Sequence, residues 1–251
     1  MIGTGISSGT GSYSFTWTNV GRGLYTLTAV ATDNSGVQTF SPDVLIKVLS
    51  PALFVTGSTT LSSSDSAVKT HLEALGFAVT VKDATAVSSA DANGKAVVVI
   101  SSTVSPTNLG TKFRSVATPV VTWESGSYVD MGMTAKGNSN AGTSTGQTQV
   151  KITQPSHALA GGLFGTQTVV TVSSTFAWGK PNANAASVAT LVSDATRIVI
   201  FGYQAGAVMP GLTAPARRIG LFMNDSTPAS LNNNGWILFD AAVNWATSTT
   251  P

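Results

Sequence analysis

The chain of 251 residues contains no cysteine. The absence of thiols excludes disulfide bonds, thiolate metal sites and a cysteine nucleophile. Charged side chains are also scarce, at 10% of the residues, against about 25% in an ordinary soluble domain. The net charge is only +2, and the Lys and Arg residues are scattered along the chain. We therefore expect no nucleic-acid partner, because nucleic-acid-binding domains carry a basic patch or stripe.

Long apolar runs are missing as well. No stretch approaches the ~20 consecutive apolar residues of a membrane-spanning helix, so no membrane span is expected. The first residues, MIGTGISSGTG, have neither the basic nor the apolar region of a signal peptide. Ser, Thr, Gly, Ala and Val replace the missing charge, a composition common in bacterial extracellular modules. We therefore expect a secreted or cell-surface protein whose signal peptide is not in this chain.

Residues 11–49 show the period-two alternation of half-buried antiparallel strands. Three strands are predicted, at 12–20, 24–33 and 37–49, separated by the turn sequences GRG and NSG. A sandwich of the immunoglobulin type needs about seven strands in ~100 residues. We therefore expect residues 1–50 to form an all-β, partial Ig-like segment.

Large apolar side chains of this segment, Tyr13, Phe15, Trp17, Tyr25 and Leu27, would face water without the rest of a sandwich. Exposed apolar surface is unfavourable by about 25 cal/mol per Å², and an open sheet edge invites pairing with another chain. We therefore expect residues 11–49 to dock on the rest of the chain or to pair with the same segment in a homodimer.

The pattern changes character at Ser50-Pro51. Strands and helices alternate beyond this point, at a spacing that indicates βαβ units and a parallel sheet. Antiparallel additions are expected later in the chain, at 147–157 and 166–175. The full prediction for this α/β domain, residues 51–248, comprises strands at 52–57, 77–83, 95–103, 118–125, 187–194, 197–204 and 217–224, and helices at 67–76, 108–117 and 230–248. Residues 249–251 have the composition of a linker.

Segments of this α/β part follow one another in a characteristic order: ALFVTG, LEALGF, KAVVVIS, TPVVTWES, SHALAGGL, RIVIFGYQ and GWILFDAAVNWA. This order resembles the class I glutamine-amidotransferase-like superfamily, above all its trehalose-utilisation (ThuA-like) branch and related domains of secreted bacterial hydrolases. The resemblance covers residues 52–248. It implies a flavodoxin-like sandwich with a mostly parallel central sheet and helices on both sides. Residues 11–49 separately resemble the Ig-like repeats of bacterial modular proteins.

The chemistry of that superfamily is not preserved. Active members carry a cysteine nucleophile after the strand that here reads TPVVTWES, and a histidine after the strand that here reads RIVIFGYQ. This chain has Trp123-Glu124-Ser125 and Tyr203-Gln204 at those places. Amidotransfer by thiolate attack is therefore excluded, and the resemblance implies a pseudoenzyme. We expect no cofactor and no metal site.

Ligands of open parallel α/β sheets bind at the carboxyl ends of the strands. Those ends are expected to carry Gly57-Ser58, Ser101-Ser102, Trp123-Glu124-Ser125 and Gly202-Tyr203-Gln204. Glu124 is either a general base or electrostatic anchor, or a cap for the turn that follows it. Ser125 lacks the first glycine of a nucleophile elbow.

The other candidate site residues can also be explained by a purely structural role. His157 is either an acid or base, or a structural residue of its Gly-Gly turn. Trp123, Tyr128, Trp178 and Tyr203 either form a sugar-stacking platform or pack in the core.

Three functions stay open. The preferred one is a non-catalytic accessory module of a secreted bacterial protein, with a polysaccharide or cell-surface glycan as its partner. Its ligand-binding residues would be Trp123, Glu124, Ser125, Trp178, Tyr203 and Gln204. The first alternative is a hydrolase of glycosidic or ester bonds, with Glu124 as base and His157 or Tyr203 assisting. The second alternative is a structural spacer or assembly unit.

Overall fold

The computed structural model describes residues 1–9 and 11–248 and divides into two compact units. The first unit is Met1–Ser50, and the second begins at Pro51, where the strand pattern of the sequence changes. None of the helices over the described residues combines the length and apolar surface that crossing a bilayer requires.

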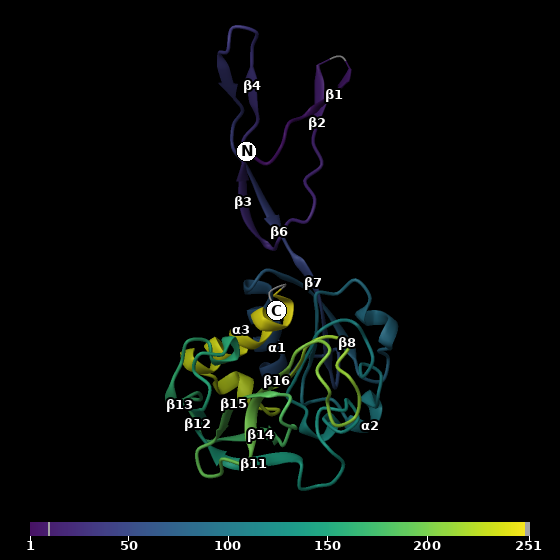
Figure 1. Ribbon diagram of the computed structural model, residues 1–251, viewed down its shortest axis with the longest axis vertical. Coiled ribbons are helices and arrows are strands. Elements are labelled where there is room, and N and C mark those ends of the chain that lie inside the picture. Colours follow the sequence, from purple (N-terminus) through teal and green to yellow (C-terminus); the bar gives the residue numbers. More distant parts are fainter. Residues whose placement is uncertain (10, 249–251) are drawn as a thin grey trace. The chain divides into compact units, whose positions relative to one another are not determined.

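The first unit consists of three antiparallel strand pairs (Figure 1). β1 (Ile6–Gly9) pairs with β2 (Ser12–Ser14), β3 (Gly23–Leu27) with β6 (Val44–Val48), and β4 (Val30–Thr32) with β5 (Gln38–Phe40). Of the segment predicted as a strand at 12–20, only Ser12–Ser14 forms one, and it pairs with β1. Within the described residues of this unit, no single sheet unites the three predicted strands. The Ig-like assignment is not confirmed.

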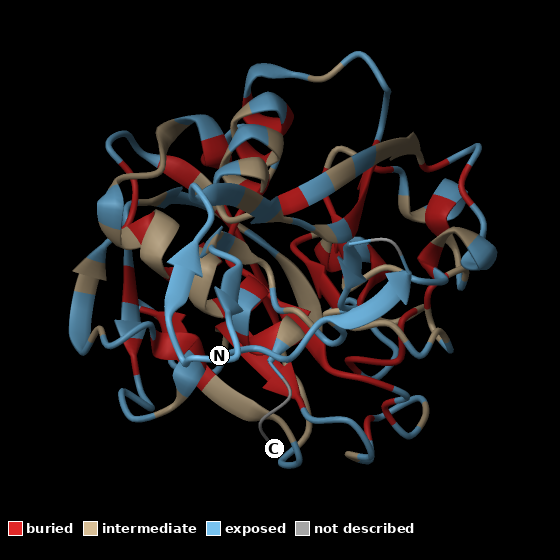
Figure 2. Cartoon of the chain, turned by 90° about the horizontal axis from the view of Figure 1, so that it is seen from above, coloured by how far each residue is buried: buried red, intermediate tan, exposed pale blue. Residues whose placement is uncertain are grey.

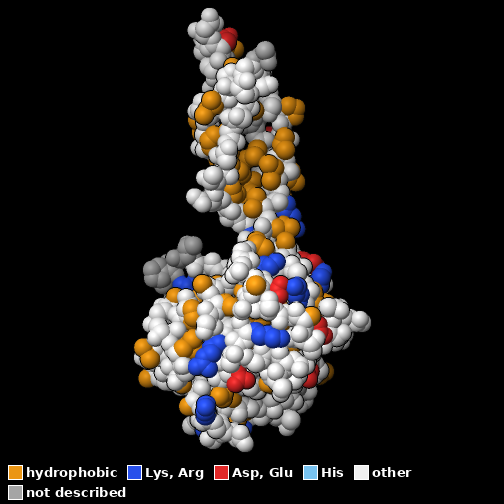
Figure 3. Space-filling model, turned by 90° about the vertical axis from the view of Figure 1, so that its right-hand side faces the viewer, with side chains coloured by type: hydrophobic (Ala, Val, Ile, Leu, Met, Phe, Trp, Pro, Cys, Tyr) orange, Lys and Arg blue, Asp and Glu red, His pale blue; other side chains and the backbone are white. Residues whose placement is uncertain are grey.

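Large apolar side chains of the first unit are exposed. Tyr13 is 73% exposed, Phe40 63% and Leu45 65%. Figure 2 shows the strands of this unit mostly in the colour of exposed residues, and Figure 3 shows hydrophobic side chains on its surface. Trp17 and Tyr25 pack edge to face, with ring centroids 4.9 Å apart. Since two-stranded sheets are marginally stable on their own, pairing of residues 11–49 with a second copy stays a prediction.

The second unit is built on one large mixed sheet with a parallel core. β7 (Ser50–Thr56), β9 (Val97–Ile100), β10 (Val120–Thr122) and β17 (Arg218–Gly220) pair in parallel, and β8 (Phe77–Asp83) lies beside β7. The order β8-β7-β9-β10-β17 corresponds to the order 2-1-3-4-5 of flavodoxin-like sheets. The predicted α/β class with a parallel core is confirmed.

Antiparallel strands extend the sheet beyond β17. β16 (Ile198–Tyr203) comes first, followed by β15 (Ala186–Leu191), β12 (Gln149–Ile152) and β13 (Gly165–Thr168). β14 (Ser174–Gly179) pairs with the start of β16 and with β11 (Ala141–Gln147). Additions near β12 and β13 were expected. β11 lies in a polar, glycine-rich stretch that gave no strand signal.

Two helices cover one face of the sheet (Figure 1). α1 (Ser63–Ala74) starts at Ser62, whose Oγ accepts the N–H of Asp65 at 3.0 Å, and it is followed by Gly76 at φ +89°. The helix predicted at 67–76 is thus present, and it begins four residues earlier than predicted. α3 (Asn233–Thr247) buries the apolar stripe that its sequence shows: Leu238, Phe239, Ala242, Val243 and Trp245.

Short elements and loops cover the other face. α2 (Pro106–Leu109) is much shorter than the helix predicted at 108–117, because Gly110 ends it at φ +53° and turns follow. Phe113 and Met131 from these loops are fully buried in the second core cluster. The apolar spacing of 108–117 therefore reflects burial, not helical structure.

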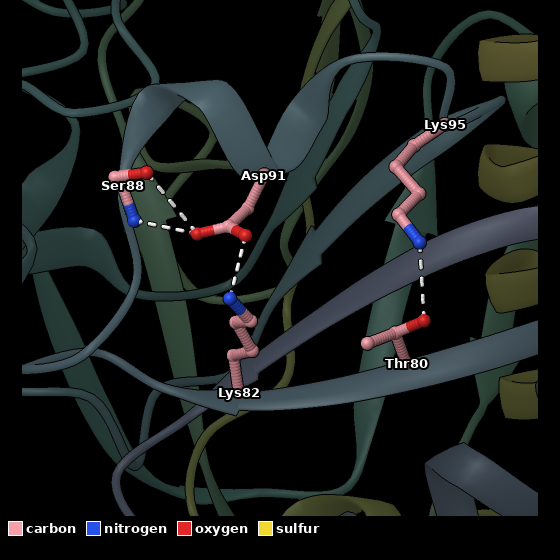
Figure 4. A network of polar contacts seen from close by, with 5 residues as sticks. All are labelled: Thr80, Lys82, Ser88, Asp91 and Lys95. Carbon is pink, nitrogen blue, oxygen red and sulfur yellow. Dashed lines mark hydrogen bonds and ion pairs between the residues drawn. The ribbon is translucent and has the colours of Figure 1, made fainter.

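The outer strand β8 is tied to the 3₁₀ helix η1 (Ser89–Ala92) by a polar network (Figure 4). Asp91 accepts a hydrogen bond from Lys82 Nζ at 2.6 Å and another from the Ser88 N–H at 2.9 Å. Lys95 donates to Thr80 Oγ1 at 3.0 Å. The Lys82 and Ser88 contacts lower the pKa of Asp91, and a lysine on an edge strand disfavours pairing with another chain.

Candidate functional site

The carboxyl ends of the parallel strands bring four short segments to one edge of the sheet. These are residues 56–58 after β7, 101–103 after β9, 123–125 after β10 and 224–225 after β17. The chain leaves β7 toward one side of the sheet and leaves β9 toward the other. The switch point, where sheets of this kind bind ligands, therefore lies between β7 and β9.

The chain itself fills the crevice at the switch point. Asp65 accepts hydrogen bonds from Ser101 Oγ at 2.6 Å and from Thr103 Oγ1 at 2.9 Å. The Gly57 N–H donates to Thr103 Oγ1 at 3.1 Å. Asp65 is 3% exposed and Ser101 1%. This network ties α1 to the end of β9 and buries Asp65 and Ser101 at the switch point.

We expect Gly57→Ala to reduce the free energy of unfolding by about 1–3 kcal/mol, the usual range for overpacking. A Cβ on Gly57 would lie 2.2 Å from the backbone oxygen of Thr103, so the backbone after β9 would have to move. Urea denaturation of the two chains measures the difference. Ser58→Ala, at the next exposed position, is the control and should change stability by less than half as much. Equal midpoints for Gly57→Ala and the parent chain would contradict a closed crevice.

Glu124 follows β10 directly, and its side chain is mostly buried. Its Oε1 accepts the Gly126 N–H at 2.7 Å and caps the 3₁₀ helix η2 (Ser125–Ser127). No described residue donates to or pairs with its Oε2. Burial raises the pKa of Glu124 to about 7; the Gly126 hydrogen bond opposes this rise and the charge of Asp225 adds to it. The carboxyl therefore caps a turn with one oxygen and keeps the other available.

Ser102 follows β9 (Val97–Ile100) in a turn, at the edge of the sheet where Glu124 follows β10. Pro106 also approaches Gly126, which places the chain after β9 beside the Glu124 turn. Ser102 is 7% exposed, and its Oγ has no hydrogen-bond partner among the described residues.

Asp225 lies at the same edge of the sheet as Glu124, and it was not among the site residues predicted from the sequence. The Leu221 N–H donates to the Thr122 oxygen at 3.0 Å, which extends the parallel pairing of β17 with β10. The chain then continues to Asp225, which is exposed. A prediction that 217–224 is a parallel strand would have placed the sequence NDS, which contains Asp225, at the same edge of the sheet as Glu124.

Tyr203 and Gln204 lie at the opposite edge of the sheet. β16 runs antiparallel to β17, and Tyr203 pairs with Arg218, the first residue of β17. Tyr203 is fully buried, and its hydroxyl accepts the Asn182 N–H and donates to the Met133 oxygen. Gln204 accepts a hydrogen bond from Arg217 Nε at 2.7 Å. The expectation that both residues join Glu124 in one site is wrong, because it assumed that β16 is parallel.

His157 is also remote from Glu124. Its Nδ1 accepts the Leu159 N–H at 3.1 Å and caps the 3₁₀ helix η3 (Ala158–Ala160). Its ring packs against Trp245, which Arg217 covers on the amino side of β17. Burial and the Arg217 charge lower the pKa of His157. These contacts fit the structural alternative, in which His157 stabilises its own turn.

The expected sugar-stacking platform is absent among the described residues. Trp123 is fully buried against Phe54 and Phe239, and Tyr128 is fully buried as well. Trp178 is 7% exposed, and the Arg197 guanidinium lies 4.8 Å from its ring centroid. Stacking on a sugar requires an open ring face. Ser125, the first residue of η2, is also buried at 7% exposure.

Glu124 and Asp225 therefore form the candidate site, which we call the carboxyl-edge site. Over residues 1–9 and 11–248, no group of three or more His, Cys, Asp or Glu side chains is arranged to hold a metal ion. What the carboxyl-edge site offers is two carboxyl groups, both of them able to accept hydrogen bonds.

Comparison with known proteins identifies no family for this chain. No protein-family model and no curated protein matches the sequence. One solved structure with a related arrangement is that of a provisionally assigned GMP synthase component from Thermoplasma acidophilum, with 13% identity and a TM-score of 0.47. The match covers 78% of this chain and 94% of that one. Similarity at this level carries no functional argument, and the fold assignment rests on the strand order described above.

Proposed function

We propose that this chain is a non-catalytic accessory module of a secreted modular protein, and that it binds a glycan at the carboxyl-edge site. The observation that supports this most is Glu124, a mostly buried carboxyl with one available oxygen at the carboxyl end of a parallel strand. Ligand sites of α/β sheets concentrate at such strand ends. Ionisable groups with strongly displaced pKa values also concentrate at functional sites.

Neither of the two expected catalytic assistants lies beside Glu124, and this favours binding over catalysis. General acid–base catalysis of hydrolysis needs a second group within reach of the reacting bond. His157 and Tyr203, the expected assistants of Glu124, belong to the opposite edge of the sheet. The hydroxyl of Ser101 is buried and bonded to Asp65, so it is not presented as a nucleophile.

A glycoside hydrolase is the second candidate, and Asp225 is the observation that favours it. Two carboxyl groups flanking the scissile bond are the usual machinery of these enzymes, with the pKa of the acid raised. Glu124 has a raised pKa, and Asp225 is close enough to contribute to it. On this proposal Glu124 would donate the proton to the leaving group and Asp225 would assist water.

Affinity electrophoresis on a panel of polysaccharides, followed by reducing-end assays, tests both proposals. We expect Glu124→Ala to weaken the binding of any retained glycan by roughly tenfold or more, the effect of losing a hydrogen bond to a charged group. Glu73→Ala, at an exposed helix position paired with Lys69, is the matched control and should leave binding unchanged. Tyr203→Phe should also leave it unchanged.

Three outcomes decide between the proposals. Retention of a glycan that is indifferent to Glu124→Ala would show that the site lies elsewhere. Release of new reducing ends that Glu124→Gln abolishes would replace the binding proposal by the hydrolase. The absence of any retention across the panel would reject both and favour the structural spacer.

A further inference from the structure

Asparagine is followed by glycine at two places in the chain, Asn93-Gly94 and Asn234-Gly235. In such a pair the backbone nitrogen of the glycine can attack the side-chain carbonyl carbon of the asparagine, because glycine has no side chain to hinder the approach. The attack needs an asparagine side chain that is not held by hydrogen bonds, a free glycine N–H and rotation of the backbone between the two residues. The two pairs differ in each of these respects.

Asn93 and Gly94 are the central residues of the turn that joins η1 to β9. Asn93 lies at φ −63° and ψ 132°, and Gly94 at φ +70°, which is the conformation of a type II turn. The Lys95 N–H donates to the Ala92 oxygen at 3.1 Å and closes the turn. Both central residues are exposed, and no described residue hydrogen-bonds to the Asn93 side chain or to the Gly94 N–H. The hydrogen bond that rotation of this turn has to break is that of Lys95.

Asn234 and Gly235 lie in the first turn of α3, where the same groups are engaged. Asn234 Nδ2 donates to Gln167 Oε1 at 3.1 Å and to the Thr168 oxygen at 3.3 Å. The Gly235 N–H donates to the capping residue Asn232, at 3.1 Å from its Oδ1, and Gly235 is buried. Rotation between Asn234 and Gly235 would therefore uncap the helix and disturb buried backbone.

We propose that Asn93 is a site of spontaneous modification, converted through a succinimide to aspartate and isoaspartate, and that Asn234 is protected from it. In the first step the Gly94 nitrogen loses its proton to the solvent and bonds to Cγ of Asn93, while the side-chain nitrogen takes up a proton and leaves as ammonia. In the second step water adds to one of the two carbonyl carbons of the ring and opens it. Opening at the side-chain carbonyl gives aspartate, and opening at the main-chain carbonyl gives isoaspartate.

The modification changes the charge and the backbone at one place on the surface. Asn93 and Lys112 line the same groove of about 700 Å³, together with Ser89, Thr111 and Ser115. Either product places a carboxylate in this groove, to which Lys112 contributes a charge of opposite sign. Isoaspartate also lengthens the backbone between η1 and β9 by one carbon atom. The inference is independent of the proposed glycan binding.

Peptide mapping of the native chain after incubation at mildly alkaline pH tests the inference. Trypsin cleaves after Lys and Arg, so residues 83–95 carry Asn93 and residues 219–251 carry Asn234, to which fragmentation assigns the change. We expect ammonia loss at Asn93 to be at least about tenfold faster than at Asn234, which corresponds to about 1.4 kcal/mol in the free energy of local opening. In concentrated urea the two rates should be equal. Asn93→Gln should suppress the change in the first peptide, because glutamine has to close a larger ring.

Other outcomes would overturn the inference. Equal rates at the two positions in the native chain would show that the fold does not distinguish the two pairs. Modification of Asn93 in urea but not in the native chain would show that the turn is protective. An endoproteinase that cleaves before aspartate but not before isoaspartate separates the two products. Aspartate without isoaspartate would indicate direct hydrolysis of the side chain and exclude the succinimide.

Discussion

Replacing Arg218 by methionine is expected to lower the free energy of unfolding by at least about 3 kcal/mol. The Arg218 side chain is fully buried, yet no carboxylate pairs with it among the described residues. Its guanidinium donates instead to six backbone oxygens, those of Phe113, Arg114, Val116, Thr118, Ala216 and Arg217. Four of these oxygens belong to the irregular segment at residues 113–118.

The free energy of unfolding is expected to fall because the substitution removes the hydrogen-bond donor of these backbone carbonyl groups. Methionine fills much of the same space but donates no hydrogen bond; the Arg217 oxygen would keep the Val120 N–H, and the other five oxygens would lose the guanidinium as a donor. Each such group is unfavourable by about 1–3 kcal/mol. Burial lowers the pKa of Arg218 to about 10, so the guanidinium is still charged at neutral pH and its hydrogen bonds are charge-assisted.

Urea denaturation followed by circular dichroism measures the effect. Arg114→Met is the matched control, because the Arg114 side chain is only partly buried and bonds the oxygens of Asp130 and Gly211. We expect a loss of about 1 kcal/mol for the control. Arg218→Lys should recover only part of the stability, since one ammonium cannot span the oxygens that a guanidinium reaches. A loss below about 1 kcal/mol for Arg218→Met would show that 113–118 is held by other contacts.

Local features of the fold could be predicted from the sequence because their causes are local. Ser62 and Gly76 bound α1 through hydrogen bonding and backbone conformation within a few residues. The apolar runs of β7 and β9 reflect burial on both faces, which any sheet order would require. The break at Ser50-Pro51 is likewise visible as a change of period.

Strand direction could not be predicted in the same way. The segment that became β16 has the apolar pattern of a buried strand, and that pattern is identical for parallel and antiparallel neighbours. Its antiparallel pairing with β17 moves Tyr203 to the edge opposite Glu124, and the parallel pairing of β17 with β10 brings Asp225 into the site. Long-range pairing, which periodicity does not encode, thus removed Tyr203 from the candidate site and added Asp225 to it. Arg217 and Arg218 face opposite ways, as adjacent strand residues must, but their burial against carbonyl groups also depends on distant loops.

Replacing Glu124 by glutamine is expected to raise the free energy of unfolding by about 3 kcal/mol at pH 8 and to leave it nearly unchanged at pH 4. The pKa of Glu124 is about 7 in the folded chain, against 4.5 for an ordinary glutamate. Below about pH 4.5 the carboxyl is protonated in both states. Between 4.5 and 7 it ionises in the unfolded state only, so the parent chain loses stability as the pH rises through this window. Glutamine mimics the protonated form, retains an oxygen for the Gly126 N–H and does not ionise.

Urea denaturation of both chains at several pH values from 4 to 8 measures this difference directly. His157 contributes in the opposite direction, because a lowered pKa makes the folded state gain stability as the pH rises toward that of an ordinary histidine. Its contribution cancels, since both chains contain it. Asp83, Asp91 and Asp194 have lowered pKa values and act only at more acidic pH. If the free energies of unfolding of Glu124→Gln and the parent chain differed by the same amount at every pH from 4 to 8, the Glu124 carboxyl would be exposed to water. The proposed carboxyl-edge site would then lose its central residue.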